Sequence, residues 1–189
     1  MSGLISLPNV GLLGRLRSGK DEVARYLSDN YGYTQFAFGD ELKSDFHRRY
    51  PEIPRESKPR VGYQAHGQLM RALIDEDIWV RNCLAEVHRV HYAHEDLRAV
   101  ISDVRQPNEY DALKSAGYVL IRVEASDAVR IDRAIKSGDV FNYVDLVHDT
   151  ETALGGYTAD FTVDNSGTLD ALHAQIDEIV AYLSGDWPE

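Results

Sequence analysis

The sequence has almost no cysteine and no long apolar stretch. Cys83 is the single cysteine among 189 residues, so no internal disulfide can form, and we expect this side chain to serve as a small buried hydrophobe. No apolar run approaches the roughly 18 residues that a membrane span needs. The first residues carry no basic region ahead of their apolar ones, so no signal peptide is predicted. We therefore expect a cytoplasmic protein with no membrane partner.

Positive charge is also scarce. Lys and Arg number 20 against 31 Asp and Glu, which gives a formal net charge of -11 at pH 7. An acidic surface disfavours extended binding to a nucleic-acid polymer, because such binding needs many cationic contacts. It does not exclude a mononucleotide, which needs only a local cluster of Lys and Arg inside a cleft. Repeats and low-complexity segments are absent, and the length suits one domain with a sizeable core.

The most informative motif lies near the N-terminus, where residues 14–20 have the spacing G-x-x-x-x-G-K. This spacing turns backbone N–H groups toward a phosphate and places a lysine within reach of the outer phosphates. The apolar run Val10 to Leu13 before it is typical of a strand covered on both faces. After it, Val23 and Leu27 share one helical face. The residues predicted to bind ATP are Gly14, Arg15, Leu16, Arg17, Ser18, Gly19, Lys20 and Asp21.

Strand and helix patterns alternate along the whole chain. Apolar runs predict strands at about 8–13, 34–38, 98–102, 118–123 and 161–164, with helices at about 19–31, 40–50, 60–74, 76–93, 107–116, 126–137 and 169–183. This alternation predicts an α/β fold with a mainly parallel sheet flanked by helices on both faces. Together with the loop at 14–20 it indicates a three-layer P-loop NTPase fold. A single domain over residues 1–189 is predicted, with a helical substrate-binding insertion at about 40–93 and a lid-like segment at about 126–157.

Two carboxylates are candidate metal ligands. Asp103 follows a strongly apolar strand pattern, and ligands of parallel sheets bind at the carboxyl ends of the strands. A carboxylate there resembles the aspartate that holds magnesium or orients the nucleophile in P-loop enzymes; the alternative is a cap for the helix that begins near Pro107. Asp21 occupies the position where such loops usually carry Ser or Thr. It either contacts magnesium, directly or through water, or it has a structural role, in which it caps the helix N-terminus or holds a neighbouring basic side chain.

Basic side chains gather where phosphate chemistry would need them. Lys20 is predicted to neutralise charge between the β- and γ-phosphates as the transition state develops. Arg17 is predicted to clamp phosphate, whereas Arg15 is as readily a surface charge. Arg130 and Arg133 belong to the lid-like segment and are predicted to stabilise the charge of the transferred group. The residues predicted to be catalytic are Lys20, Arg17, Asp103, Arg130 and Arg133.

A second group of residues is predicted to bind the acceptor. Asp40 and Lys43 follow the strand pattern at 34–38, and Gly67 and Arg71 fall one helical turn apart. The structural alternatives are a helix cap for Asp40, surface charge for Lys43 and Arg71, and core packing for Trp79. The candidates are Asp40, Lys43, Gly67, Arg71, Trp79, Arg105 and Glu151.

Six motifs follow one another along the chain: Gly14 to Asp21, Phe38 to Lys43, Gly67 with Arg71 and Trp79, Val100 to Glu109, His148 to Glu151, and Asp164 to Thr168. In this order and spacing they resemble the deoxynucleoside monophosphate kinases of bacteriophages. The resemblance implies a nucleoside monophosphate kinase fold, ATP and Mg²⁺ as cosubstrates, and transfer of the γ-phosphoryl group to a deoxynucleoside 5′-monophosphate. It also implies a homodimer as one option. Glu22 stands where the family commonly has Thr, so the way magnesium is held is left open.

Three alternatives stay open. Animal-type phosphomevalonate kinase is similar at the same places, with a basic loop ending in Ser-Gly-Lys-Asp, and dephospho-coenzyme A kinase is a more distant rival. A nucleotide-binding switch without a small acceptor belongs to a different class and predicts slow hydrolysis that ignores added monophosphates. The cations outside the loop favour the kinase, and the Asn-Lys-x-Asp motif of GTP-specific proteins is absent. The base that is accepted and the choice between ribose and deoxyribose are open.

Overall fold

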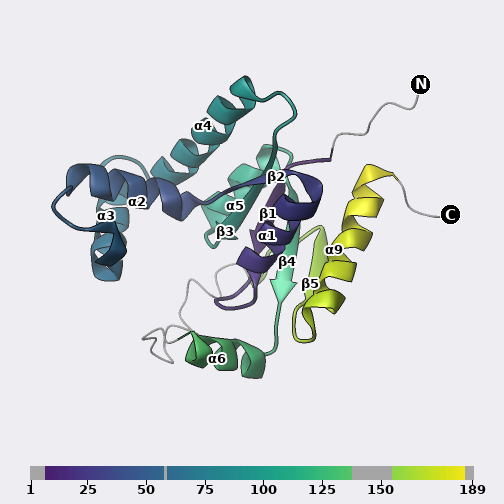
Figure 1. The fold of residues 1–189 in the computed structure, drawn as a ribbon. Coiled ribbons are helices and arrows are strands. Elements are labelled where there is room, and N and C mark those ends of the chain that lie inside the picture. The colour runs from purple at the N-terminus through teal and green to yellow at the C-terminus, as the bar shows by residue number, and fades with distance from the viewer. Residues whose placement is uncertain (1–6, 58, 138–154, 186–189) are drawn as a thin grey trace. The chain divides into compact units, whose positions relative to one another are not determined.

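Five strands form one sheet in the order β2-β3-β1-β4-β5 (Figure 1). The structure is a computed structural model that describes residues 7–57, 59–137 and 155–185. The elements are β1 (Val10–Leu13), α1 (Lys20–Tyr31), β2 (Tyr33–Phe36), α2 (Phe38–Arg49), the short 3-10 helix η1 (Arg55–Ser57), α3 (Arg60–Leu73), α4 (Ile78–Ala93), β3 (Arg98–Val104), α5 (Pro107–Ser115), β4 (Val119–Glu124), α6 (Asp127–Lys136), β5 (Phe161–Asp164) and α9 (Leu169–Ser184).

The central strand β1 explains the layers of the molecule. It pairs in parallel with β3 on one side and β4 on the other, and β5 continues the sheet in parallel from β4. Val10 and Leu12 pack into the core cluster that α1 and α9 cover. On the opposite face, a Cβ at Gly11 would lie 2.8 Å from Leu113 of α5. Helices therefore cover both faces of the sheet, and the predicted fold class is confirmed (Figure 1).

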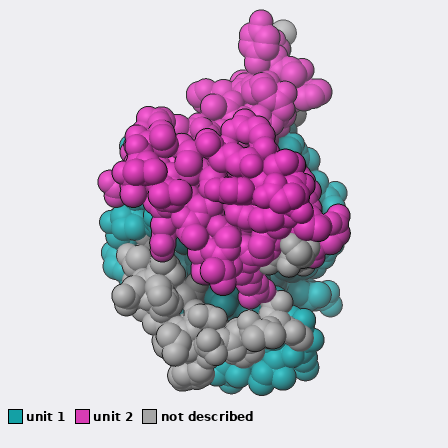
Figure 2. Space-filling model, turned by 90° about the vertical axis from the view of Figure 1, so that its left-hand side faces the viewer, with its two compact units in different colours: residues 1–35, 98–189 teal, residues 36–97 magenta. Residues whose placement is uncertain are grey.

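The chain divides into two compact units, coloured separately in Figure 2. Unit 1 contains residues 1–35 and 98–189, and unit 2 contains residues 36–97. Unit 2 is helical and includes the segment 40–93 for which the sequence predicts an insertion; its substrate-binding role stays a prediction. None of the helices in the described ranges has the length and apolar composition that a bilayer crossing requires.

Unit 2 holds its helices together around a buried carboxylate. Asp45 of α2 accepts hydrogen bonds from Arg48 and Arg49 on its own helix and from His66 Nε2 of α3 at 2.8 Å. Burial alone would raise the pKa of Asp45, but the hydrogen bonds from Arg49, His66 and Arg48 outweigh it and leave that pKa below its ordinary value. Trp79 of α4 is 2% exposed and packs with Met70 and Ile78. Unit 2 therefore has a small hydrophobic core of its own.

Two boundary predictions are wrong. Phe38 does not end a strand but begins α2, because its ring is buried and the backbone is already helical there. The cap of α2 is consequently Ala37, and Asp40 lies in the first turn, where its N–H donates to the Ala37 carbonyl at 3.1 Å. Asp40 is therefore not the predicted helix cap. At the other boundary, β3 continues past residue 102 to Val104, which pairs with Leu13.

Candidate phosphate-binding site

The segment between β1 and α1 adopts the conformation that a phosphate loop needs. Gly14 has φ 146° and Gly19 has φ 104°, both in a region that side chains rarely adopt. A Cβ at Gly14 would lie 2.3 Å from the Val123 carbonyl oxygen, so the loop can pass this close to β4 only without a side chain. Arg17 also has a positive φ of 64°. The glycine spacing seen in the sequence thus reflects two real backbone requirements.

Lys20 and Ser18 present polar groups at this loop. The Lys20 side chain is 8% exposed, and its ammonium donates to the carbonyl oxygens of Gly14 at 2.6 Å and Arg15 at 3.0 Å. Ser18 is 1% exposed, and its Oγ has no hydrogen-bond partner in the described part of the chain. An unpaired buried hydroxyl is costly, and Ser18 lines a cavity. The hydroxyl is therefore placed to meet a ligand.

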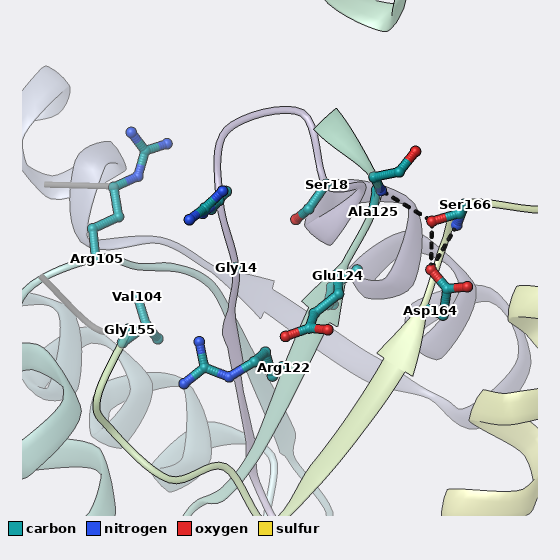
Figure 3. A pocket seen from close by; sticks show the side chains of 13 residues that line it. Gly14, Ser18, Val104, Arg105, Arg122, Glu124, Ala125, Gly155, Asp164 and Ser166 are labelled. Carbon is teal, nitrogen blue, oxygen red and sulfur yellow. Dashed lines mark hydrogen bonds between the residues drawn. The ribbon is translucent and has the colours of Figure 1, made fainter. Parts of the chain in front are cut away.

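The cavity beside the loop has a volume of about 490 Å³ and opens at the carboxyl ends of four strands. Arg105 follows β3, and Arg122 and Glu124 project from one face of β4 toward the same space (Figure 3). The Arg122 guanidinium also donates to the Tyr157 carbonyl, which orients it. The lining residues are Gly14, Arg15, Ser18, Val104, Arg105, Arg122, Val123, Glu124, Ala125, Ser126, Gly155, Asp164 and Ser166. This set combines cations for an anionic ligand with oxygen acceptors for its polar groups.

Asp103 lies in β3, the strand that flanks β1 directly. Its alternative role as a helix cap is wrong, because α5 is capped by Gln106 in a capping box with Glu109. The Glu109 carboxylate accepts the N–H groups of Arg105 at 2.7 Å and Gln106 at 2.9 Å. Asp103 is therefore not used to start the helix, and it sits one residue before the strand end that borders the cavity.

The two acidic residues after Lys20 have different environments. Asp21 is exposed in the first turn of α1, whose N-cap is Gly19 rather than an acidic side chain. Glu22 is bound by Arg25 at 2.6 Å and by His173 of α9 at 3.0 Å. Burial would raise the pKa of Glu22, but hydrogen bonds from Arg25 and His173 outweigh it and lower that pKa. Glu22 thus links α1 to α9, which leaves Asp21 as the carboxylate available to a metal at this end of the helix.

The four arginines predicted around the loop occupy two kinds of position. Arg15 is half exposed and pairs with Asp127 at 3.4 Å, and Arg17 donates to Ser137 Oγ at 2.9 Å. Arg130 is 3% exposed and donates from Nε to the Leu16 carbonyl at 2.8 Å. Arg133 donates to the carbonyls of Arg17 and Ser18, each at 3.3 Å. Arg130 and Arg133 therefore contact the backbone carbonyls of the loop; their contact with phosphate stays a prediction.

The predicted acceptor residues other than Arg105 and Glu151 belong to unit 2. Asp40 and Lys43 form an exposed ion pair at 2.7 Å. An Arg71 nitrogen lies 3.8 Å from the position of a Cβ on Gly67, so this pair is adjacent as the helical spacing predicts. Trp79 is buried with Met70, Ile78 and Leu42, and its indole N–H donates to the Gly67 carbonyl at 3.3 Å, which supports core packing. Glu151 and His148 lie outside the described residues.

The sequence prediction misses three residues that the structure places at the site. Arg122 and Glu124 line the cavity, and Asn165 after β5 donates from Nδ2 to the Ser18 carbonyl at 2.8 Å. A signal was available, because all three lie at or just beyond the carboxyl ends of predicted strands, where ligands of a parallel sheet bind. The sequence prediction draws on the carboxyl ends of the first three predicted strands only. A search at the ends of the strands at 118–123 and 161–164 would have found these three residues.

Comparisons with known proteins agree with this architecture. The chain is 28% identical to a protein of Acanthamoeba polyphaga mimivirus named "Putative deoxynucleotide monophosphate kinase", over 69% of this chain and 85% of the relative. It superposes on a gluconokinase from Sinorhizobium meliloti with a TM-score of 0.60 at 18% identity, over 96% of this chain and 95% of the other. A shikimate kinase from Acinetobacter baumannii gives 0.57 at 14% identity, over 98% of both chains.

No protein-family model matches the chain. The structural similarities nevertheless extend over almost its full length, and the strand order, phosphate loop and following helix lie where that fold requires them. This protein has the fold of the P-loop kinases.

Proposed function

We propose that this protein is an ATP-dependent kinase that transfers the γ-phosphoryl group to a deoxynucleoside 5′-monophosphate. The observation that carries the proposal is the phosphate loop itself. Its Lys20 ammonium bonds to the Gly14 carbonyl, and its unpartnered Ser18 hydroxyl lies at a cavity lined by arginines. The similarity to the mimivirus protein, whose name specifies deoxynucleotide monophosphates, supports the choice of acceptor. The resemblance of the sequence motifs to the bacteriophage enzymes supports the same choice.

The donor phosphates are assigned to the loop. Backbone N–H groups bind the phosphate oxygens, and Lys20 exchanges its bonds with the Gly14 and Arg15 carbonyls for phosphate oxygens when the donor arrives. As charge builds on the transferred group, the ammonium and the Arg17 guanidinium stabilise it. Arg130 Nε and Arg133 Nη1 already donate to loop carbonyls. Contact of either guanidinium with the transferred group would use its other N–H donors or replace one of these bonds.

The acceptor phosphate is assigned to guanidinium groups, since these bind phosphate through two parallel hydrogen bonds. Arg105 and Arg122 meet this requirement in the cavity of unit 1. The acceptor is already anionic, so no general base has to remove a proton. The remaining predicted acceptor residues, Asp40, Lys43, Gly67, Arg71, Trp79 and Glu151, keep that role as part of the proposal.

Magnesium fits the oxygen donors at this end of the sheet. Within the described ranges, no three or more His, Cys, Asp or Glu side chains gather into a metal-binding group. Mg²⁺ is usually held by one or two carboxylates together with substrate phosphates, and Asp103 and Asp21 are the carboxylates that would supply this. Bound there, the ion would neutralise charge on the β- and γ-phosphate oxygens.

A panel of acceptors tests the proposal. The protein is incubated with ATP and Mg²⁺ and, in separate reactions, with each common deoxynucleoside monophosphate, the matching ribonucleotides, phosphomevalonate and dephospho-coenzyme A. We expect ADP to form with at least one deoxynucleotide and not without an acceptor. ADP formation only with phosphomevalonate or only with dephospho-coenzyme A would show that this compound, and not a deoxynucleotide, is the acceptor. Slow ADP formation indifferent to every acceptor would indicate a nucleotide-binding switch instead.

A further inference from the structure

Three successive carbonyls of the phosphate loop are held by side chains that come from distant parts of unit 1 and do not line the cavity, so they lie outside the loop as seen from the cavity. Arg130 Nε binds the Leu16 carbonyl at 2.8 Å, and Arg133 Nη1 contacts the next two carbonyls at 3.3 Å. Asn165 Nδ2 binds the Ser18 carbonyl at 2.8 Å. We name Arg130, Arg133 and Asn165 the carbonyl clasp. The clasp joins the loop to α6 and to the segment that follows β5.

Peptide geometry gives the clasp a consequence for ligand binding. The C=O and N–H of a planar trans peptide group point in opposite directions. Holding the carbonyls of residues 16–18 from outside therefore turns the N–H groups of residues 17–19 toward the inside of the loop. The Ser18 N–H donates to the Arg15 carbonyl at 3.1 Å, and this bond across the turn fixes the loop further. Inward N–H groups are what an anion needs from such a loop.

Asn165 is fixed in the one orientation that serves this purpose. Its side-chain oxygen accepts from Arg133 Nη2 at 3.1 Å, and its own carbonyl accepts from the same nitrogen at 2.9 Å. Because the oxygen is occupied by Arg133, the amide nitrogen is the atom that faces Ser18. The residue is 2% exposed, and its backbone N–H donates to the Glu124 carbonyl at 2.7 Å. Asn165 is thus anchored to β4 and to α6.

The contact also explains the second glycine of the loop. A Cβ at Gly19 would lie 2.0 Å from Asn165 Nδ2, closer than any two such atoms can come. The amide of Asn165 therefore occupies the space beside the glycine that an ordinary residue would fill. Loop and clasp fit one another at this point, where α1 begins.

We infer that Asn165 is a positioning residue that, with Arg133 and Arg130, holds the loop in the conformation that binds a nucleoside triphosphate. The inference rests on the proposed function, because it concerns the same donor site. Preformed loops avoid the entropy cost of ordering on binding. Loss of the Asn165 amide donor should therefore weaken triphosphate binding without unfolding the protein.

The test compares two substitutions of the same kind. Asn165→Asp replaces the donor by a carboxylate that faces the Ser18 carbonyl but still pairs with Arg133. Asn30→Asp is the matched control, because Asn30 Nδ2 also binds a backbone carbonyl, that of Tyr26 at 3.0 Å, at the far end of α1. The probe is Mg²⁺ with β,γ-imido-ATP, whose binding is measured by calorimetry. Amide hydrogen exchange of residues 15–20 is measured without ligand.

We expect Asn165→Asp to bind the probe about ten-fold more weakly, the effect of losing one buried hydrogen bond, and to exchange its loop amides faster. Asn30→Asp should match wild type in both. If Asn165→Asp lowers the melting temperature strongly, Asn165→Ala replaces it in the same comparison. If the Asn165 variant binds the probe and exchanges its loop amides as wild type does, the inference about Asn165 is overturned and the proposed function is not affected. Probe binding by wild type without transfer to any deoxynucleotide overturns the proposed acceptor alone, and no binding by wild type overturns both.

Discussion

The phosphate loop and the helical unit 2 both bury polar side chains, but these side chains bond to different things. In unit 2, Asp45 bonds to other side chains, those of His66, Arg48 and Arg49, and this network joins regular helices. At the loop, Arg130, Arg133 and Asn165 bond to backbone carbonyls of a segment that has no regular structure of its own.

The difference teaches what each arrangement stabilises. A helix already satisfies its backbone, so a buried network between helices adds to the stability of the unit. A loop with its carbonyls held outward has its N–H groups directed inward, and these serve a ligand. Substitutions in the two regions should therefore separate: those at the loop reduce function with the fold retained, and those in unit 2 reduce stability with nucleotide binding retained.

The largest effect is expected at Lys20. Lys20→Ala removes the ammonium that stabilises charge on the transferred phosphoryl group, and turnover should fall by about 10²- to 10³-fold. The helix that begins at Lys20 tolerates alanine well, so circular dichroism and the melting temperature should change little. Turnover is measured by ADP release with the preferred deoxynucleotide.

Lys114→Ala is the control, since Lys114 forms a surface ion pair with Asp160 at 2.8 Å and does not line the cavity. Its turnover should equal that of wild type. Unchanged turnover in Lys20→Ala would remove Lys20 from the mechanism.

The next effect is expected on the stability of unit 2. Asp45→Ala leaves the buried His66 without the partner of its Nε2, and a buried unpaired polar group costs about 2 kcal/mol. The free energy of unfolding, measured in urea, should fall by about this amount, while the folded protein binds β,γ-imido-ATP as wild type does. A loss of nucleotide binding in the folded variant would break the separation between the two regions.

The sign of the pH dependence provides a check on Asp45. Because the folded-state pKa of Asp45 lies below its ordinary value of 3.8, its contribution is complete above that pH and is lost as the pH falls through the folded-state value. The stability difference between wild type and Asp45→Ala should therefore narrow in acid. A difference that widens below this pH would contradict the assigned hydrogen bonds.

A matched pair of glycine substitutions sharpens the comparison, and the effect on stability in unit 2 is expected to be small. In Gly67→Ala the new methyl meets only the movable end of Leu42, at 2.5 Å, and alanine favours the helix by about 1 kcal/mol. The net change in stability should stay within about 1 kcal/mol. Gly19→Ala meets the fixed amide of Asn165 at a φ of 104°, so β,γ-imido-ATP binding should be lost. β,γ-imido-ATP binding is measured for both variants, and equal affinities of the two would contradict the proposed role of the loop.

The type and order of the elements were largely predictable from the sequence, because most strands contain a short apolar run and the helices alternate with them. The boundaries were less so. Phe38 reads as the end of a strand by its apolar ring, but that ring is buried from within α2. Asp103 reads as a strand end, although β3 gains one more pair, between Val104 and Leu13. Both errors come from tertiary contacts that local patterns do not contain.

The candidate site divides in the same way. Gly14, Gly19 and Lys20 were predictable, because the loop requires their backbone freedom and charge at a fixed spacing. Asn165 was named only within the motif Asp164 to Thr168 and was given no role. Its place beyond a strand was visible in the sequence, but its partner Ser18, 147 positions away in the chain, was not. The roles of Arg130 and Arg133 show the same limit: the sequence indicates cations near phosphate, and only the structure shows them on the loop carbonyls.

The most direct test of the central claim is to follow the γ-phosphoryl group itself. The protein is incubated with Mg²⁺, ATP labelled at the γ-phosphorus and the deoxynucleotide that the acceptor panel selects, and the labelled products are separated. The account predicts that the label appears in the deoxynucleoside diphosphate, in a one-to-one ratio with ADP. Label that appears only as inorganic phosphate, at the same rate with and without the deoxynucleotide, would contradict it.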